Sequence, residues 1–253
     1  MKNNIFSLIR FYYLLRRQIF SNFKKNALGF GSIVGVLLAI TLLTGMGNPV
    51  YHISALFPLY VVIFLIGGYI YTSSIFAELS SVQRGVTALT LPVSKLERLA
   101  AAWVLTALLY PIMAMLGVLL ISLLTGLAHG FETTSNIASV LFSKSTFNLI
   151  VIYIITKSIF LFGAIYFRKN NFFKTIGSVI LIQLVLLIIV LVAAILMFGG
   201  MGANIVVDNM SISSSTDKFL PTTIIEIIGY GLRFLFAPFF WLLTWFGIKE
   251  REV

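Results

Sequence analysis

The stretch LVLLIIVLVAAILMF, residues 184–198, contains no charged or polar side chain. Apolar runs of about 20 residues are long enough to cross the roughly 30 Å hydrocarbon core of a bilayer as a helix, and such runs recur along the chain. The short alternating strands of a membrane β-barrel would read differently. The sequence therefore predicts an all-α, polytopic membrane protein.

Composition supports this class and excludes several kinds of chemistry. The 253 residues are 59% hydrophobic and only 10% charged, whereas soluble domains carry about 25% charged residues. The absence of cysteine excludes disulfides and thiolate sites. His52 and His129 lie in or beside predicted loops, and no metal-hydrolase or serine–histidine pattern accompanies them. The glycine-rich stretch 199–204 lacks the lysine of a phosphate-binding loop. We expect no catalytic, cofactor-binding or metal site in this chain.

Two regions are expected. Residues 1–25 form an amphipathic interfacial helix, because Arg10 and Arg17 share a polar stripe while aromatic and aliphatic side chains occupy the rest. The alternative is a longer first span with a charged start. Residues 26–253 form a six-span transmembrane domain, whose long third span contains Pro111 and can kink there. The expected spans are Ala27–Gly47, Ile53–Phe76, Leu99–Leu127, Phe147–Phe167, Thr175–Phe198 and Ile224–Ile248.

The basic residues indicate the orientation. With a cytoplasmic N-terminus, only Lys144 and Lys218 of the 18 Lys and Arg residues fall on the opposite side, and only Lys157 and Arg233 fall inside spans. The positive-inside rule then places both termini in the cytoplasm. The net charge of +10 is explained by topology and by anionic membrane lipid, so we expect no nucleic-acid partner. Arginines near the N-terminus interrupt any signal-peptide core, so no cleavable signal is expected.

Three charged residues lie within predicted spans. Lys157 is near the middle of the fourth, and Arg233 is in the sixth, two turns after Glu226 on the same helix face. A charge in the membrane needs a partner or a wet cavity. These residues are possible parts of a translocation path for a substrate with an anionic group, or they pair for stability.

Small residues occur in the first two spans. Gly29, Gly31, Gly35, Gly67 and Gly68 are expected to allow close helix approach.

The third span has a defined start. Pro92 ends whatever precedes it, and Ser94 followed three residues later by Glu97 is a capping box directly before an apolar run. The helix should therefore begin at about Lys95, after a cytoplasmic loop over residues 77–98.

This loop carries a family resemblance. Its phrase F-x-E-L…G…L-x-L-P-V-S-K-x-E is similar to one found in type-2 permeases, the membrane subunits of ATP-binding-cassette (ABC) exporters. The matching residues are Phe76, Glu78, Leu79, Gly85, Leu89, Leu91, Pro92, Val93, Ser94, Lys95 and Glu97. The layout of an amphipathic helix and six spans also resembles that family.

The resemblance implies a multi-pass protein of the bacterial inner membrane that exports an amphipathic or hydrophobic substrate, such as a peptide, lipid or drug. Two permease chains, identical or homologous, would pair with two copies of an ABC ATPase subunit, which holds the ATP and Mg. Residues 77–98 would contain the coupling helix. Its expected ATPase contacts are Glu78, Arg84, Val86 and Leu89.

Two other classes remain open. One is a non-transporting scaffold or a peptide-immunity protein, which would have no ATPase partner. The other is an ion-coupled carrier, although no acidic residue lies deep in a predicted span.

Overall fold

The computed structural model describes residues 6–21, 23–44, 49–76, 93–129, 140–167, 170–198 and 222–251. The elements in these residues are all helices: α1 (Leu8–Ser21), α2 (Phe23–Thr44), α3 (Pro49–Ser74), α6 (Lys95–Val104), η1 (Leu105–Leu109), α7 (Tyr110–His129), α9 (Lys144–Tyr166), α10 (Asn171–Phe198) and α11 (Thr222–Arg251). The expectation of an all-helical chain is confirmed for this part of it.

Five segments are long and apolar enough to cross a membrane. They are α2, Leu56–Ser74 of α3, the continuous helix Lys95–Ala128, α9, and Asn171–Ala193 of α10. The chain is therefore a membrane-embedded protein. Helix α11 covers the expected sixth span, but its side chains are described only over residues 235–250. Six crossings, and the side on which each terminus lies, stay predictions.

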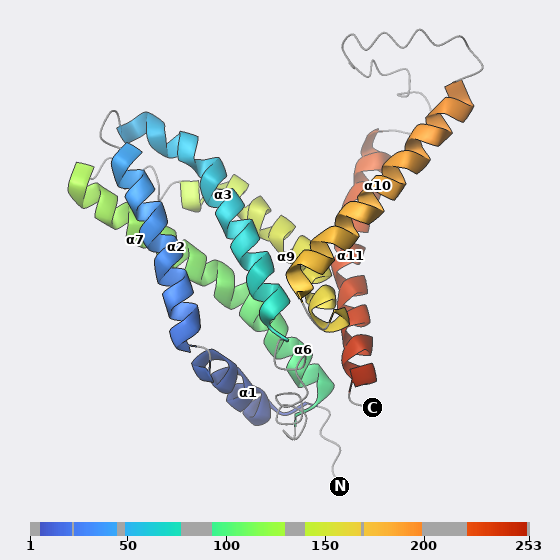
Figure 1. The fold of residues 1–253 in the computed structure, drawn as a ribbon, viewed down its shortest axis with the longest axis horizontal. Coiled ribbons are helices and arrows are strands. Elements are labelled where there is room, and N and C mark those ends of the chain that lie inside the picture. Colours follow the sequence, from blue (N-terminus) through green and yellow to red (C-terminus); the bar gives the residue numbers. More distant parts are fainter. Residues whose placement is uncertain are drawn as a thin grey trace.

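The helices spread apart from a common lower end (Figure 1). Helices α2, α3 and α7 form one arm, α10 and α11 form the other, and α9 runs between them, packing against α3, α10 and α11. Helix α1 lies across the lower end, where α6 begins and α11 ends.

The core lies in the lower half, where α6, α9 and α11 meet the end of α3. Its buried members are Phe76, Ala102, Leu161, Ala164, Ile165 and Ile248. By contrast, no residue in the most apolar stretch of α10 is buried. The start of the helix is covered, because Thr175 is buried against Gly163 of α9. The rest of α10 presents apolar side chains outward, as a helix facing lipid would.

The long third span contains a widened turn directly before Pro111. Residues 105–109 are π-helical, and the Tyr110 amide bonds the Leu105 carbonyl five residues back. In this register the carbonyl of Thr106 would need the amide of residue 111, which is a proline without an N–H. The π turn and Pro111 together leave the Thr106 carbonyl without a backbone partner.

The glycines behave in two ways. A Cβ on Gly67 would meet the Tyr110 hydroxyl at 2.8 Å, and one on Gly68 would collide with the rings of Tyr110 and Tyr153, so both allow close packing as expected.

The expectation is wrong for Gly29, Gly31 and Gly35, where nothing lies within 4 Å of an added Cβ. Their faces of α2 are open. The close approach of α2 to α7 occurs instead at Gly117, where a Cβ would stand 2.9 Å from the ring of Phe30.

Candidate functional site

The capping box expected at the start of the third span is present. Ser94 has extended backbone angles, and its hydroxyl accepts the Glu97 amide at 3.2 Å. Glu97 Oε2 in turn accepts the Ser94 amide at 2.8 Å. Helix α6 begins at Lys95 because these two side chains satisfy amides that the first turn leaves free.

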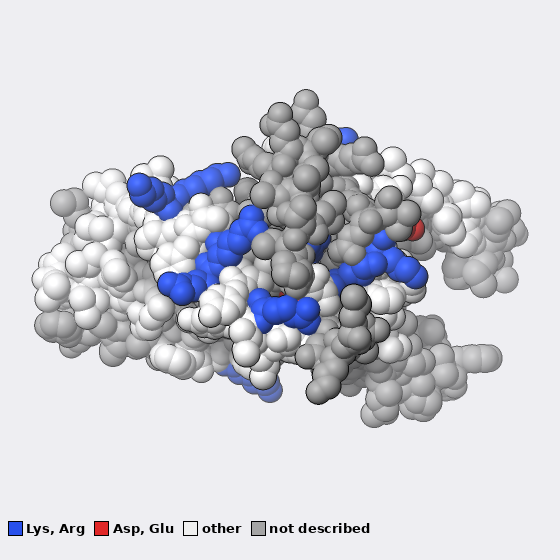
Figure 2. Space-filling model, turned by 90° about the horizontal axis from the view of Figure 1, so that it is seen from below, with Lys and Arg blue, Asp and Glu red and all other residues white. Residues whose placement is uncertain are grey.

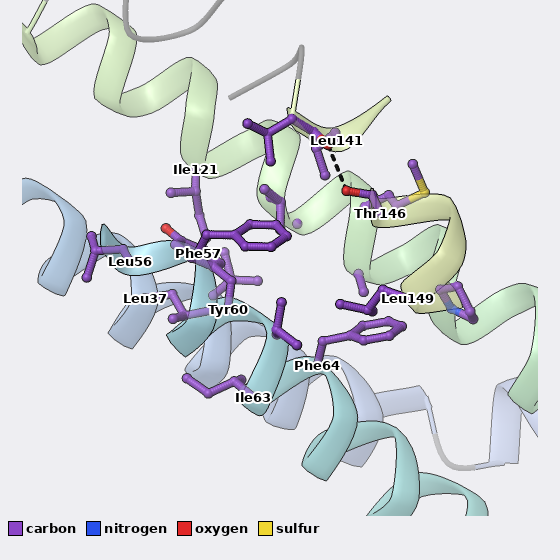
Figure 3. Close-up of a pocket in the computed structure, with 18 of the residues that line it drawn as sticks. Leu37, Leu56, Phe57, Tyr60, Ile63, Phe64, Ile121, Leu141, Thr146 and Leu149 are labelled. Carbon is purple, nitrogen blue, oxygen red and sulfur yellow. Dashed lines mark hydrogen bonds between the residues drawn. The ribbon is translucent and has the colours of Figure 1, made fainter. Parts of the chain in front are cut away.

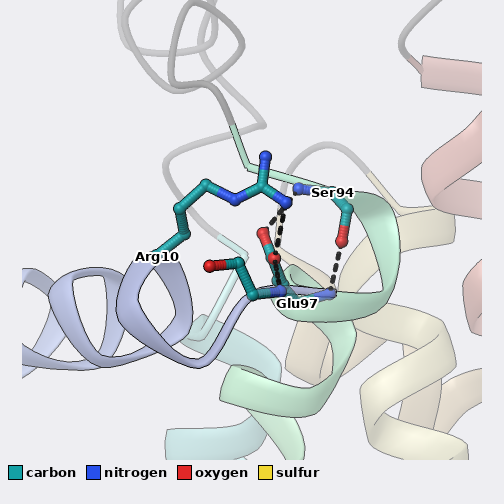
Figure 4. Close-up of polar contacts among 4 residues, drawn as sticks. Arg10, Ser94 and Glu97 are labelled. Carbon is teal, nitrogen blue, oxygen red and sulfur yellow. Dashed lines mark hydrogen bonds and ion pairs between the residues drawn. The ribbon is translucent and has the colours of Figure 1, made fainter. Parts of the chain in front are cut away.

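The second oxygen of the same carboxylate binds helix α1. Glu97 Oε1 accepts the Ser7 amide at 2.6 Å, and Arg10 Nη2 lies 3.2 Å from it (Figure 4). A residue that caps its own helix therefore also holds the N-terminal end of α1. We call the set Ser7, Arg10, Ser94 and Glu97 the Glu97 junction.

The carboxylate of the Glu97 junction is buried. The Glu97 side chain is 0% exposed, whereas the Arg10 side chain is 36% exposed. An isolated buried carboxylate is strongly disfavoured, but here two backbone amides and one guanidinium satisfy it. Removing one partner from such a buried group costs more than removing a surface ion pair, which contributes only about 0–1 kcal/mol.

The junction lies at one end of the predicted coupling loop. The other end is Phe76, which is buried in the core against α6, α9 and α11. Both flanks of residues 77–92 are therefore fixed to the lower end of the bundle. Glu78, Arg84, Val86, Leu89 and Pro92 lie outside the described residues, so their roles stay predictions.

The lower end is basic. Seen from below, Lys and Arg side chains are spread over this face, with little acidic surface among the described residues (Figure 2). Exposed members occur on α1, at the starts of α2 and α10, and at the end of α11: Arg16, Arg17, Lys24, Lys25, Lys174 and Lys249. Helix α1 also exposes large apolar side chains, including Ile9 and Phe20. An exposed apolar and basic helix of this kind suits a membrane surface.

Lys157 is buried between helices. Its ammonium donates to the Thr106 hydroxyl at 2.7 Å and to the Trp103 carbonyl at 3.4 Å, and it lies 5.3 Å from the centre of the Trp103 ring. Within the described residues no carboxylate is within 4.0 Å of it. In this arrangement Lys157 joins α9 to the end of α6, and a part in a translocation path stays a prediction.

One turn earlier on α9, Tyr153 hydrogen-bonds to the π turn. Its hydroxyl donates at 3.0 Å to the Thr106 carbonyl, the group that Pro111 leaves without a backbone donor. Tyr153 and Lys157 therefore hold both ends of the stretch Trp103–Thr106. A widened turn with this support is a defined place for the third span to bend.

The remaining charged candidates lie on α11. The helix contains both Glu226 and Arg233, but their side chains are outside the described part of the chain. Within the residues that the structure describes, no three His, Asp or Glu side chains gather in a way that could hold a metal ion.

Sequence reasoning missed two members of the junction. The pattern of residues 1–25 predicts a polar stripe that includes Arg10 but indicates no partner for it, and it gives Ser7 no role. The available signal was the capping box itself, since a box uses one oxygen of Glu97 and leaves the other to be satisfied.

Comparisons of the chain with models of known protein families, with curated proteins and with solved structures find no match. What the protein does is therefore inferred from its own residues and their geometry.

Proposed function

We propose that this chain is the membrane subunit of an ABC exporter of the type-2 permease class, coupled to a separate ATPase through residues 77–98. The observation that carries the proposal is the Glu97 junction. It fastens the end of that loop to an interfacial helix as well as to the third span. A loop that merely connects two spans does not need such an attachment.

The attachment gives force on the loop two routes into the membrane. Phe76 passes movement into the core at the end of α3, where α6, α9 and α11 meet. Glu97 passes it into α6 and, through Arg10, into α1. Helix α6 continues through the π turn into α7, and that turn is a defined place for the third span to bend. ATP-driven closure of the partner subunits then switches the bundle between inward- and outward-facing states.

The basic lower face fits the same orientation. Lys and Arg side chains at the cytoplasmic surface would contact anionic headgroups and keep α1 in the interface. The protein would reside in a bacterial inner membrane, with a second permease chain completing the path and two ATPase copies beneath. Apolar walls favour an amphipathic or hydrophobic substrate. ATP and Mg belong to the ATPase.

Purification from the native host in mild detergent tests the proposal. We compare the wild type with the double variant Glu78→Ala, Arg84→Ala, and identify bound proteins by mass spectrometry. The matched control is Lys249→Ala, Glu250→Ala, which also removes one base and one acid, from exposed positions at the end of α11.

The proposal expects a Walker-motif ATPase with the wild type and the control, and its loss from the loop variant. A chain that arrives without an ATPase in all three preparations would move the assignment to a scaffold or immunity protein. Transport that follows an ion gradient and ignores ATP would move it to a carrier.

A further inference from the structure

The arm formed by α2, α3 and α7 contains, in its upper part, an apolar cavity of about 480 Å³. Helices α2, α3, α7 and α9 all contribute to it: Figure 3 shows Leu37, Tyr60, Ile121 and Leu149 around the space. Its volume falls within the range of about 300–1,000 Å³ found for small-molecule sites. The lining part of α2 extends from Phe30 to Thr41, which corresponds to roughly 16 Å of helix.

The lining is almost entirely hydrocarbon. No lining residue is charged, and the aromatic members include Phe57, Phe64 and Tyr110. Such a space does not attract water, because water needs several polar partners. Left empty, it would forfeit the dispersion contacts of its walls.

Three hydroxyl groups of the wall, on the side formed by α2, α3 and α7, already make hydrogen bonds within the protein. Thr41 donates to the Leu37 carbonyl at 2.7 Å, so its oxygen accepts from the Tyr60 hydroxyl at 2.6 Å. Tyr110 donates to the Phe64 carbonyl at 2.7 Å. None of these three hydroxyls retains a hydrogen for a carboxylate or phosphate. This side of the cavity therefore suits the hydrocarbon part of a molecule and not a polar headgroup. The other hydroxyls of the wall, on Ser143, Ser145 and Thr146, lie together at the start of α9.

The cavity is reachable from lipid. Most of its wall belongs to segments long and apolar enough to cross a membrane. One of these wall residues, Ile33 of α2, is 42% exposed. Bilayer chains therefore meet the edge of the cavity without any separation of helices.

We propose that this cavity is a binding site for one acyl chain of a bilayer phospholipid, whose headgroup stays outside. The site follows from the cavity alone and is independent of the transport function proposed above. The bound chain restores the contacts that the walls of α2, α3, α7 and α9 do not make with one another.

Photolabelling in micelles tests the site. The full chain is held in mild detergent, and phosphatidylcholine with a diazirine near the middle of one acyl chain is added in rising proportion as the phospholipid present. After illumination, labelled peptides are mapped by mass spectrometry. Labelling on residues 57–64 and 114–121 should saturate as the probe fraction rises, whereas labelling on the exposed residues 184–190 of α10 should rise in proportion.

Two variants sharpen the test. Ala114→Phe places a ring in the cavity, because Ala114 lines it, and should abolish the saturable labelling. Ala39→Phe adds the same ring to an exposed position of α2 outside the lining and should keep it. Unchanged labelling of α10 shows that a variant is folded. If Ala114→Phe fails to fold, the saturation of cavity labelling in the wild type still tests the proposal.

Three results would overturn the proposal. The first is cavity labelling that is absent or rises in proportion like that of α10, as expected if side chains of a second copy fill the space. The second is saturable labelling that a folded Ala114→Phe retains. The third is saturable labelling by a diazirine fatty acid but not by the phospholipid, which would assign the site to a free fatty acid.

Discussion

Replacing Glu97 with Gln perturbs the junction with the least change of shape. The carboxylate accepts from Ser94 with one oxygen and from Ser7 and Arg10 with the other. Glutamine has one oxygen, which accepts, and one NH₂ group, which only donates. The NH₂ group must therefore face other donors, either the Ser94 amide or the Ser7 amide and the Arg10 guanidinium. Because the site is fully buried, the donor left without an acceptor and the lost charge-assisted bond together should cost about 2–4 kcal/mol.

The assay is thermal unfolding in detergent, followed by tryptophan fluorescence. For a chain of this size, 1 kcal/mol shifts the midpoint by about 2–4 °C. The midpoint of Glu97→Gln should therefore fall by roughly 4–16 °C. The control Glu250→Gln makes the same chemical change at an exposed position and should leave the midpoint unchanged. Ser94→Ala removes only the cap and should cost about 1 kcal/mol.

A double-mutant cycle then isolates the contact between α1 and α6. Arg10→Met should destabilise the wild type but have little effect beside Glu97→Gln, with a coupling of about 0.5–3 kcal/mol. If the two substitutions add, or if Glu97→Gln behaves like Glu250→Gln, the junction does not tie α1 to the loop and the reasoning fails.

Three further substitutions test the packing of the bundle by the same unfolding assay. Lys157→Met keeps the side-chain volume and removes a buried charge, so the free energy of unfolding should change by less than about 1 kcal/mol. Lys157→Ala leaves a cavity and should cost about 2–4 kcal/mol. Equal losses for the two variants would contradict this account. Gly68→Ala should cost about 1–3 kcal/mol because two tyrosine rings block its Cβ, while Gly35→Ala, which meets nothing, should be neutral or stabilising. Tyr153→Phe should cost about 1–3 kcal/mol, because the Thr106 carbonyl loses its donor. The cost should be smaller in a Pro111→Ala background, because the new alanine amide can donate to the same carbonyl. An equal cost in both backgrounds would refute the account of the π turn.

Local features were predictable from the sequence. The apolar runs predict the helices because about 20 apolar residues match the length of a helix that crosses the bilayer. Ser94 and Glu97 predict a helix start because both partners of the capping box lie within one turn. The burial of Lys157 also follows from its place in an apolar run.

Features that depend on distant partners were not predictable. Ser7 and Glu97 are 90 positions apart, and nothing in the α1 pattern distinguishes Arg10 from the other arginines that face outward. The partners of Lys157 depend on a π turn, which Pro111 permits but does not require. Spacing alone marked the α2 glycines as packing positions, but the contact with α7 lies at Gly117 instead.

Site-specific photo-crosslinking from the coupling loop tests the central claim most directly. A benzophenone amino acid is placed at Val86, and at Phe142 as the control, which is exposed two residues before α9 begins. The start of α9 lies away from the lower end of the bundle (Figure 1). Each variant is illuminated in cells of the native host. The account predicts an adduct between Val86 and a Walker-motif ATPase, and none from Phe142. No ATPase adduct from Val86, or the same adduct from both positions, would contradict it.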